Sequence, residues 1–170
     1  MSKHHPIFVT GPQRSGSRIA AHIISKKTDR VFIDELDYHP SISLNSVVQA
    51  PFLLKSVLEL SYAFPTAQFA FMYRDVDDIV KSMERIEWYK DFIDHPGFYL
   101  DYVKHCYRYI DFLKKELSYN RWFDISYESL SCDPLFVTNR DNFTVKQHIP
   151  NKPLGPKTWR NDDYVRSITK

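Results

Sequence analysis

The hydrophobic positions of this chain form short apolar runs that alternate with amphipathic helical stretches. Residues 7–10 (IFVT) and 68–73 (QFAFMY) are β-branched and aromatic runs with the composition of buried strands. Each is followed by a helical pattern, at 19–24 after the first run and from Val76 to Met83 after the second. A strand followed by a helix, repeated along the chain, indicates parallel βαβ units.

The remaining segments extend the same alternation. They predict further strands at 30–34, 52–55 and 122–126, and helices at 57–64 and from about 98 to 117. The sequence therefore predicts an α/β fold, a three-layer sandwich around a central parallel sheet of about five strands. In such folds the ligand sites lie at the carboxyl ends of the strands.

Composition favours a single domain over residues 1–170, with 43% hydrophobic residues to form a core. The formal net charge is +2 and the chain has no block of like charges, so neither nucleic acid nor a membrane surface is an expected partner. No apolar run is long enough to span a membrane, and the first strand follows the N-terminus closely, so the expected location is cytoplasmic. Cys106 and Cys132 lack metal-type spacing and are expected to be reduced thiols. The polar segment 133–170 is expected to be ordered only in part, or through contact with a ligand.

The loop from Gly11 to Gly16 carries the strongest chemical signal. It joins the predicted strand 7–10 to the start of a helix, and its glycines allow the main chain to approach a ligand. Backbone N–H groups and the helix dipole at such a junction favour an anion, so the loop predicts a phosphate site. Its GxxxxG frame is that of the nucleotide-binding P-loop, but Ser17 and Arg18 replace the Lys and Ser or Thr of that motif. Binding of Mg-ATP in the usual way is therefore not expected.

Arg74 marks a second candidate site. It ends the strand 68–73, at the edge where this class of fold places ligand contacts. Asp75 can cap the following helix, on which Ser82 lies one turn after Asp78. From the residues alone, Arg74 fits either a bidentate contact with phosphate or a salt bridge to a nearby aspartate.

Four segments in this order resemble the PAPS-dependent sulfotransferases (PAPS is 3′-phosphoadenosine 5′-phosphosulfate). Residues 11–17 (GPQRSGS) resemble the family's loop for the 5′-phosphosulfate, and residues 53–56 resemble a Lys-Ser/Thr-Pro segment of many members. Residues 73–83 (YRDVDDIVKSM) resemble its 3′-phosphate element, a strand ending in Arg with a Ser eight positions later. Residues 125–134 (ISYESLSCDP) resemble the stretch whose Tyr lies by the adenine. The resemblance covers the chain from 7 to 134.

The resemblance implies in-line transfer of a sulfonate group from PAPS to a hydroxyl or amine, with PAP (3′-phosphoadenosine 5′-phosphate) as product and no metal. The resemblance implies that Arg14 holds the sulfonate and its bridging oxygen, while Arg74 and Ser82 hold the 3′-phosphate, and it places Arg14 and Ser82 among the catalytic residues. Arg18 either reaches the same phosphate as the loop or is solvated on the helix surface. The implied nucleotide contacts also include Ser15, Gly16, Ser17 and Tyr127, together with Lys157 and Trp159 from a C-terminal segment that closes over the nucleotide.

A general base is needed to take the acceptor's proton. The resemblance points to Glu35, because protein-tyrosine and heparan-type sulfotransferases place a catalytic Glu after the corresponding strand. His39 is the alternative base, since the small-molecule members of the family use a His. Lys55 can pair with the transferring group or with Glu35, or can be a plain surface residue. The acceptor stays open among glycans, peptide tyrosines, lipids and small metabolites.

Two other functions compete with this one. A small-molecule kinase would have Gly-Lys-Ser/Thr at 16–18 and an Asp for magnesium, and the sequence has Gly-Ser-Arg there. A non-catalytic nucleotide-binding relative, having lost its acceptor pocket, would keep the phosphate motifs, so the motifs do not distinguish it from an enzyme.

Overall fold

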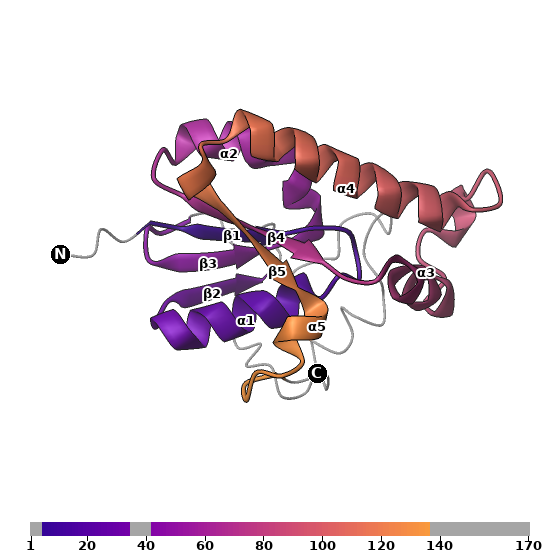
Figure 1. Ribbon diagram of the computed structural model, residues 1–170, viewed down its shortest axis with the longest axis horizontal. Coiled ribbons are helices and arrows are strands. Elements are labelled where there is room, and N and C mark those ends of the chain that lie inside the picture. Colours follow the sequence, from indigo (N-terminus) through magenta and orange to yellow (C-terminus); the bar gives the residue numbers. More distant parts are fainter. Residues whose placement is uncertain (1–4, 35–41, 137–170) are drawn as a thin grey trace, which may run out of the picture.

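The computed structural model describes residues 5–34 and 42–136, which build one all-parallel sheet flanked by helices (Figure 1). The strands are β1 (Ile7–Thr10), β2 (Val31–Asp34), β3 (Ser46–Gln49), β4 (Gln68–Tyr73) and β5 (Trp122–Ser126). Their order across the sheet is β2-β3-β1-β4-β5, and every neighbouring pair is parallel. The predicted α/β fold with a central parallel sheet is confirmed.

Helices cover both faces of the sheet. The α-helices are α1 (Ser17–Thr28), α2 (Val57–Ala63), α3 (Val76–Arg85), α4 (Phe98–Glu116) and α5 (Tyr127–Leu130). The described residues also form the short 3₁₀ helices η2 (Pro51–Ser56), η3 (Lys90–Phe92) and η4 (Tyr119–Arg121). Figure 1 shows α2 and α4 over one face of the sheet, α1 and α5 on the other, and α3 beyond one end. This is the predicted three-layer sandwich.

Each face of the sheet buries its own core. Along β1 the side chains alternate, so Phe8 faces the α4 side while Ile7 and Val9 face α1. Phe8 stacks on Phe69 of β4, with ring centroids 5.4 Å apart. Burying one such side chain stabilises the fold by about 1.5–3 kcal/mol. Strands covered on both faces carry continuous apolar runs, which is why β1 and β4 are so visible in the sequence.

One predicted strand is wrong. Residues 52–55 lie in the 3₁₀ helix η2, because Pro51 has the fixed φ that suits a first helical turn. Leu53 and Leu54 are buried by packing this helix against the core, which explains their apolar run. The strand that the sequence reading missed is β3, whose two central valines are too short a run to show a period.

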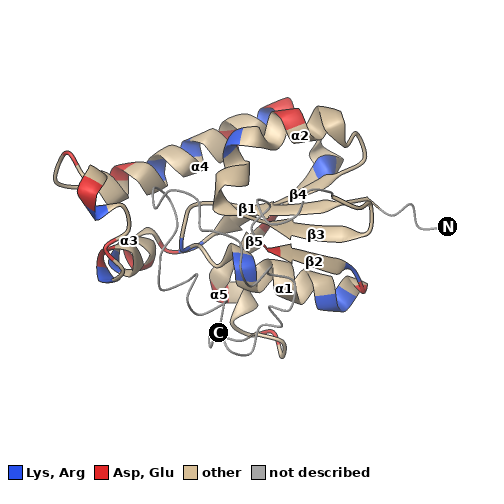
Figure 2. Cartoon of the chain, turned by 180° about the vertical axis from the view of Figure 1, so that it is seen from behind, with Lys and Arg blue, Asp and Glu red and all other residues tan. Residues whose placement is uncertain are grey.

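Charged residues lie mainly on the helices, with both signs interspersed, and the strands carry few of them (Figure 2). In the part of the chain that the structure describes, no helix is long and apolar enough to cross a membrane. Cys106 is a buried free thiol and Cys132 an exposed one. The predicted C-terminal segment lies outside the described residues beyond Phe136.

Candidate anion site at the carboxyl edge

The carboxyl ends of four strands meet at one edge of the sheet. Gln49 at the end of β3 is in register with Asp34 of β2 and with Val9 of β1. Arg74 follows β4 directly at the same edge, and the loop 11–16 leaves β1 there. The parallel register therefore brings the two segments singled out in the sequence to the same region, as this class of fold requires.

The loop 11–16 has a strongly curled backbone. Ser15 N donates to the carbonyl of Pro12 at 3.1 Å, which closes a turn ahead of α1. Arg14 and Gly16, on either side of Ser15, have φ values of 69° and 93°. A left-handed conformation costs a non-glycine residue about 1–2 kcal/mol, so the surrounding structure must hold Arg14 in place. Turns with left-handed residues are the backbone pattern of anion-binding nests.

Both glycines of the loop are required by close packing. A Cβ on Gly11 would lie 2.9 Å from the Cβ of Met72, where the loop passes β4. A Cβ on Gly16 would lie 2.5 Å from Cδ2 of Tyr127, at the start of α5. The GxxxxG frame thus fits the loop between β4 and the Tyr127 ring, and Gly16 also needs its positive φ.

Three segments far apart in the sequence meet around Arg14. Its Nε donates to Oγ of Ser82, which is buried on α3, at 3.1 Å. Its carbonyl oxygen accepts a hydrogen bond from Nη1 of Arg74 at 3.2 Å. The Arg74 guanidinium in turn lies over the ring of Tyr127, with 4.1 Å from Cζ to the ring centroid. The structure therefore brings together four of the predicted site residues.

Arg74 is held at two points, its backbone by Tyr107 and its guanidinium by the ring of Tyr127. Tyr107 on α4 accepts from Arg74 N at 3.0 Å and donates to its carbonyl at 2.9 Å. Burial raises the pKa of Tyr107 to about 12, so its hydroxyl keeps the proton that it donates. Asp75 instead caps α3 by accepting from Asp78 N at 3.0 Å. Among the described residues no salt bridge joins Arg74 to these aspartates, which disfavours that alternative.

Two buried polar atoms of the site are unsatisfied within the described part of the chain. Ser15 Oγ and Arg74 Nε are inaccessible to water and have no hydrogen-bond partner there. Leaving such a group unpaired costs about 1–3 kcal/mol. Both atoms belong to residues of the predicted nucleotide-binding set. Phosphate oxygens accept hydrogen bonds from donors of these two kinds, a hydroxyl and a guanidinium N–H. The residues present therefore fit an anionic ligand.

Ser17 and Arg18, in the first turn of α1, point toward the β2–β3 side of the sheet. Ser17 Oγ accepts from Nε2 of Gln49 at 2.9 Å. Arg18 Nε lies 2.8 Å from Oδ2 of Asp34, and the two side chains are 9% and 3% exposed. Arg18 is therefore buried and not solvated, and its contact with the phosphate stays a prediction. A buried ion pair of this kind fixes the first turn of α1 to the end of β2.

Several predicted residues lie outside the described residues, and their roles stay predictions: Glu35, His39, Lys157 and Trp159. Lys55 lies on η2 and is exposed.

Sequence reasoning missed the tyrosines that hold the site together. Gln13 N donates to the hydroxyl of Tyr102 at 3.2 Å, so α4 fixes the loop as well as Arg74. Tyr102 and Tyr107 lie among the apolar residues of α4, where a buried Tyr hydroxyl usually needs a partner, and this was the available signal. Gln49 was missed because β3 was missed.

The fold is of the P-loop-like α/β class, with a candidate anion site at the carboxyl edge of its sheet. A family model described as Sulfotransferase family matches residues 19–140, more than half of the chain. The chain therefore belongs to the sulfotransferase family. The matched range includes Arg74, Ser82 and Tyr127, and it begins just after the loop that holds Arg14. A comparison with curated proteins found no match. Membership implies sulfonate transfer from a nucleotide sulfate donor to an acceptor.

Proposed function

We propose that the donor is PAPS and that the protein transfers its sulfonate group to a hydroxyl of the acceptor. The observation that carries this proposal is the hydrogen bond between Arg14 and Ser82, which joins the loop to α3. PAPS bears one anionic group on the 5′ carbon of its ribose and another on the 3′ carbon. Two adjacent anion sites on separate elements suit that molecule, whereas ATP carries its phosphates in one chain.

We assign the 3′-phosphate to Arg74 and Ser82. Arg74 offers a planar set of donors that matches phosphate, and its Nε is the buried unpaired atom described above. Ser82 adds a hydroxyl from the buried side of α3. The face of the Tyr127 ring packs against the Arg74 guanidinium and orients it. The edge of the same ring is proposed to contact the adenine. Nucleotide binding then exchanges the Arg14–Ser82 bond for bonds to phosphate.

We assign the 5′ end to the loop, through Arg14, Ser15, Gly16 and Ser17. The acceptor oxygen forms a bond to sulfur as the bond from sulfur to the 5′-phosphate oxygen breaks, and PAP leaves. Arg14 stabilises the negative charge that grows on the leaving oxygen, and a guanidinium does so without giving up a proton. The strained φ of Arg14 fixes the start of its side chain before the ligand arrives.

The acceptor's proton is proposed to pass to Glu35. This residue directly follows Asp34, which ends β2 at the carboxyl edge of the sheet beside the loop helix. A carboxylate is a chemically suitable acceptor for the proton of a hydroxyl group. His39 remains the alternative.

Thermal unfolding with added ligand tests the donor assignment. PAP at a hundredfold excess over its Kd stabilises the native state by about 2.7 kcal/mol, which raises the midpoint by several degrees. ATP with magnesium is expected to produce a smaller shift at the same concentration. Stabilisation by ATP with magnesium alone would overturn the proposal in favour of a kinase-type site.

A further inference from the structure

A cavity of about 760 Å³ lies beside the loop, and the nucleotide assignments above do not use it. It is lined by residues of η2, of the turn after α3 and of the α4 helix, and Gln13 lines it from the loop. Its walls are largely aromatic: Phe52, Trp88, Tyr89, Phe98, Tyr102 and Tyr109. The volume is in the range of about 300–1,000 Å³ that is typical of small-molecule sites.

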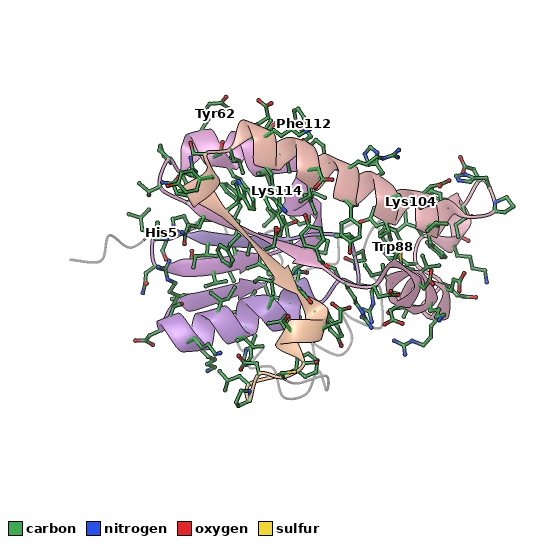
Figure 3. All side chains as sticks on the ribbon, in the orientation of Figure 1. His5, Tyr62, Trp88, Lys104, Phe112 and Lys114 are labelled. Atoms are coloured by element: carbon green, nitrogen blue, oxygen red, sulfur yellow. The ribbon has the colours of Figure 1, made fainter. Side chains whose placement is uncertain are left out.

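Trp88 is the anchor of the aromatic wall and lies between α3 and α4 (Figure 3). Its ring centroid is 4.7 Å from that of Tyr89 and 4.8 Å from that of Tyr102. Glu87 and Tyr89, on either side of it, have φ values of 50° and 55°. Two non-glycine residues in the left-handed region cost about 1–2 kcal/mol each, so this turn stores strain while it presents Trp88 to the cavity.

The charges of the lining are one-sided. Lys55 contributes an ammonium group, His105 an imidazole, and no carboxylate is found among the described residues that line the cavity. The thiol of Cys106 also lines it, and burial raises the pKa of that thiol to about 11, so it adds no negative charge near neutral pH. A ligand with a negative group at the Lys55 side would meet attraction and no repulsion from the described lining.

The cavity adjoins the transfer site through Gln13. Gln13 immediately precedes Arg14, and the Tyr102 hydroxyl that accepts from its N–H belongs to the cavity wall. A ligand that fills the cavity and reaches Gln13 therefore ends next to the residue assigned to the sulfonate. Its hydroxyl oxygen is placed to bond to sulfur while PAP leaves and the hydroxyl proton passes to the base.

We infer that this cavity is the acceptor site and that the acceptor is a flat aromatic alcohol bearing an anionic group. The inference rests on the proposed function. The aromatic walls suit a flat ring system, Lys55 suits the anionic group, and the volume of about 760 Å³ suits a small molecule.

Calorimetric titration of the PAP-saturated protein tests the inference with two probes that share one skeleton, 6-hydroxy-2-naphthoate and 2-naphthol. Both are expected to bind, the naphthoate more tightly. Lys55→Met is expected to weaken binding of the naphthoate about fivefold, which is the size of effect expected for one exposed ion pair. The affinity for 2-naphthol is expected to stay unchanged. Lys104→Met is the matched control, because Lys104 is exposed on α4 and does not line the cavity (Figure 3).

Tyr109→Leu tests the aromatic wall, and it is expected to weaken binding of both probes at least about tenfold. Tyr62→Leu is its control, since Tyr62 is 82% exposed and outside the cavity. Incubation with PAPS is expected to yield the sulfate ester of the naphthoate. PAP binding without binding of either probe overturns the acceptor site and leaves the donor assignment standing. Absence of PAP binding overturns the proposed function itself. Equal weakening of both probes in Lys55→Met overturns the assignment of the anionic group.

Discussion

Arg14 and Ser82 stand 68 positions apart in the chain and are joined by a hydrogen bond of 3.1 Å. The bond links the loop before α1 to the middle of α3, and the carbonyl of Arg14 is at the same time bound by Arg74. Because of these two contacts, a phosphate held by either segment would lie close to the other segment. This adjacency suits a nucleotide that carries anionic groups at two carbons of one ribose.

Arg14→Ala is expected to lower the turnover of PAPS by about 100-fold or more, while the Kd of PAP rises much less. The physical reason is that the guanidinium acts on charge that develops during transfer, and loss of one such donor typically costs that much. Steady-state kinetics and calorimetry with PAP measure the two effects separately. Arg85→Ala, on the exposed side of α3, is the control. An equal loss in turnover and in PAP affinity would make Arg14 a binding residue only.

Arg74→Ala is expected to weaken the binding of PAP by about 10- to 100-fold, since it removes charge-assisted hydrogen bonds. Arg74→Lys should restore only part of this affinity, because an ammonium cannot bind phosphate in a bidentate way. The same titration with adenosine 5′-monophosphate, which lacks the 3′-phosphate, is the internal control. If Arg74→Ala weakens both nucleotides to the same extent, the assignment of the 3′-phosphate fails.

Gly16→Ala and Gly97→Ala form a matched pair. Both glycines have positive φ, at 93° and 85°, but a Cβ on Gly16 would lie 2.5 Å from Tyr127 while one on Gly97 meets nothing within 4 Å. Gly97→Ala should cost about 1–2 kcal/mol of unfolding free energy through backbone strain alone. Gly16→Ala should cost more and should also abolish PAP binding. Equal losses in denaturant unfolding would show that the Tyr127 ring moves aside freely.

Cys106 and Cys132 are expected to differ in reactivity. Burial raises the pKa of the Cys106 thiol from 9.0 to about 11, so almost no thiolate is present at pH 8. Iodoacetamide at that pH should label the exposed Cys132 and spare Cys106, as read by mass spectrometry. Between pH 9 and pH 11 the thiol of Cys106 keeps its proton in the folded protein and loses it in the unfolded chain. Its contribution to the free energy of unfolding is therefore constant below pH 9 and declines as the pH rises toward 11. Rapid labelling of Cys106 in the native protein would contradict the raised pKa of its thiol.

The sequence revealed the elements whose signals are local. The strands β1 and β4 are buried on both faces, so their apolar runs are unbroken, and the predicted phosphate motifs follow directly at their ends. Arg74 and Ser82 could be singled out by resemblance because both lie within one strand–helix unit, and the structure brings them close to Arg14. The strand β3 gave no such signal, and the apolar residues of η2 imitated a strand.

The parts that could not be predicted depend on contacts between distant segments. The hydrogen bonds of Tyr102 to Gln13 and of Tyr107 to Arg74 join positions 89 and 33 residues apart. A tyrosine on the apolar side of a helix shows that its hydroxyl needs a partner, but not which one. The aromatic cavity is likewise assembled from the loop, η2, the turn at Trp88 and α4.

The central claim is that one nucleotide is gripped at two different carbons of its ribose. The most direct test compares PAP with adenosine 5′-diphosphate, an isomer that has the same atoms and carries both phosphates at the 5′ end. Calorimetric titration without magnesium should show PAP binding at least about tenfold more tightly, as expected when charge-assisted hydrogen bonds to a second phosphate are lost. Equal affinity for the two isomers, or tighter binding of the 5′-diphosphate, would contradict the account.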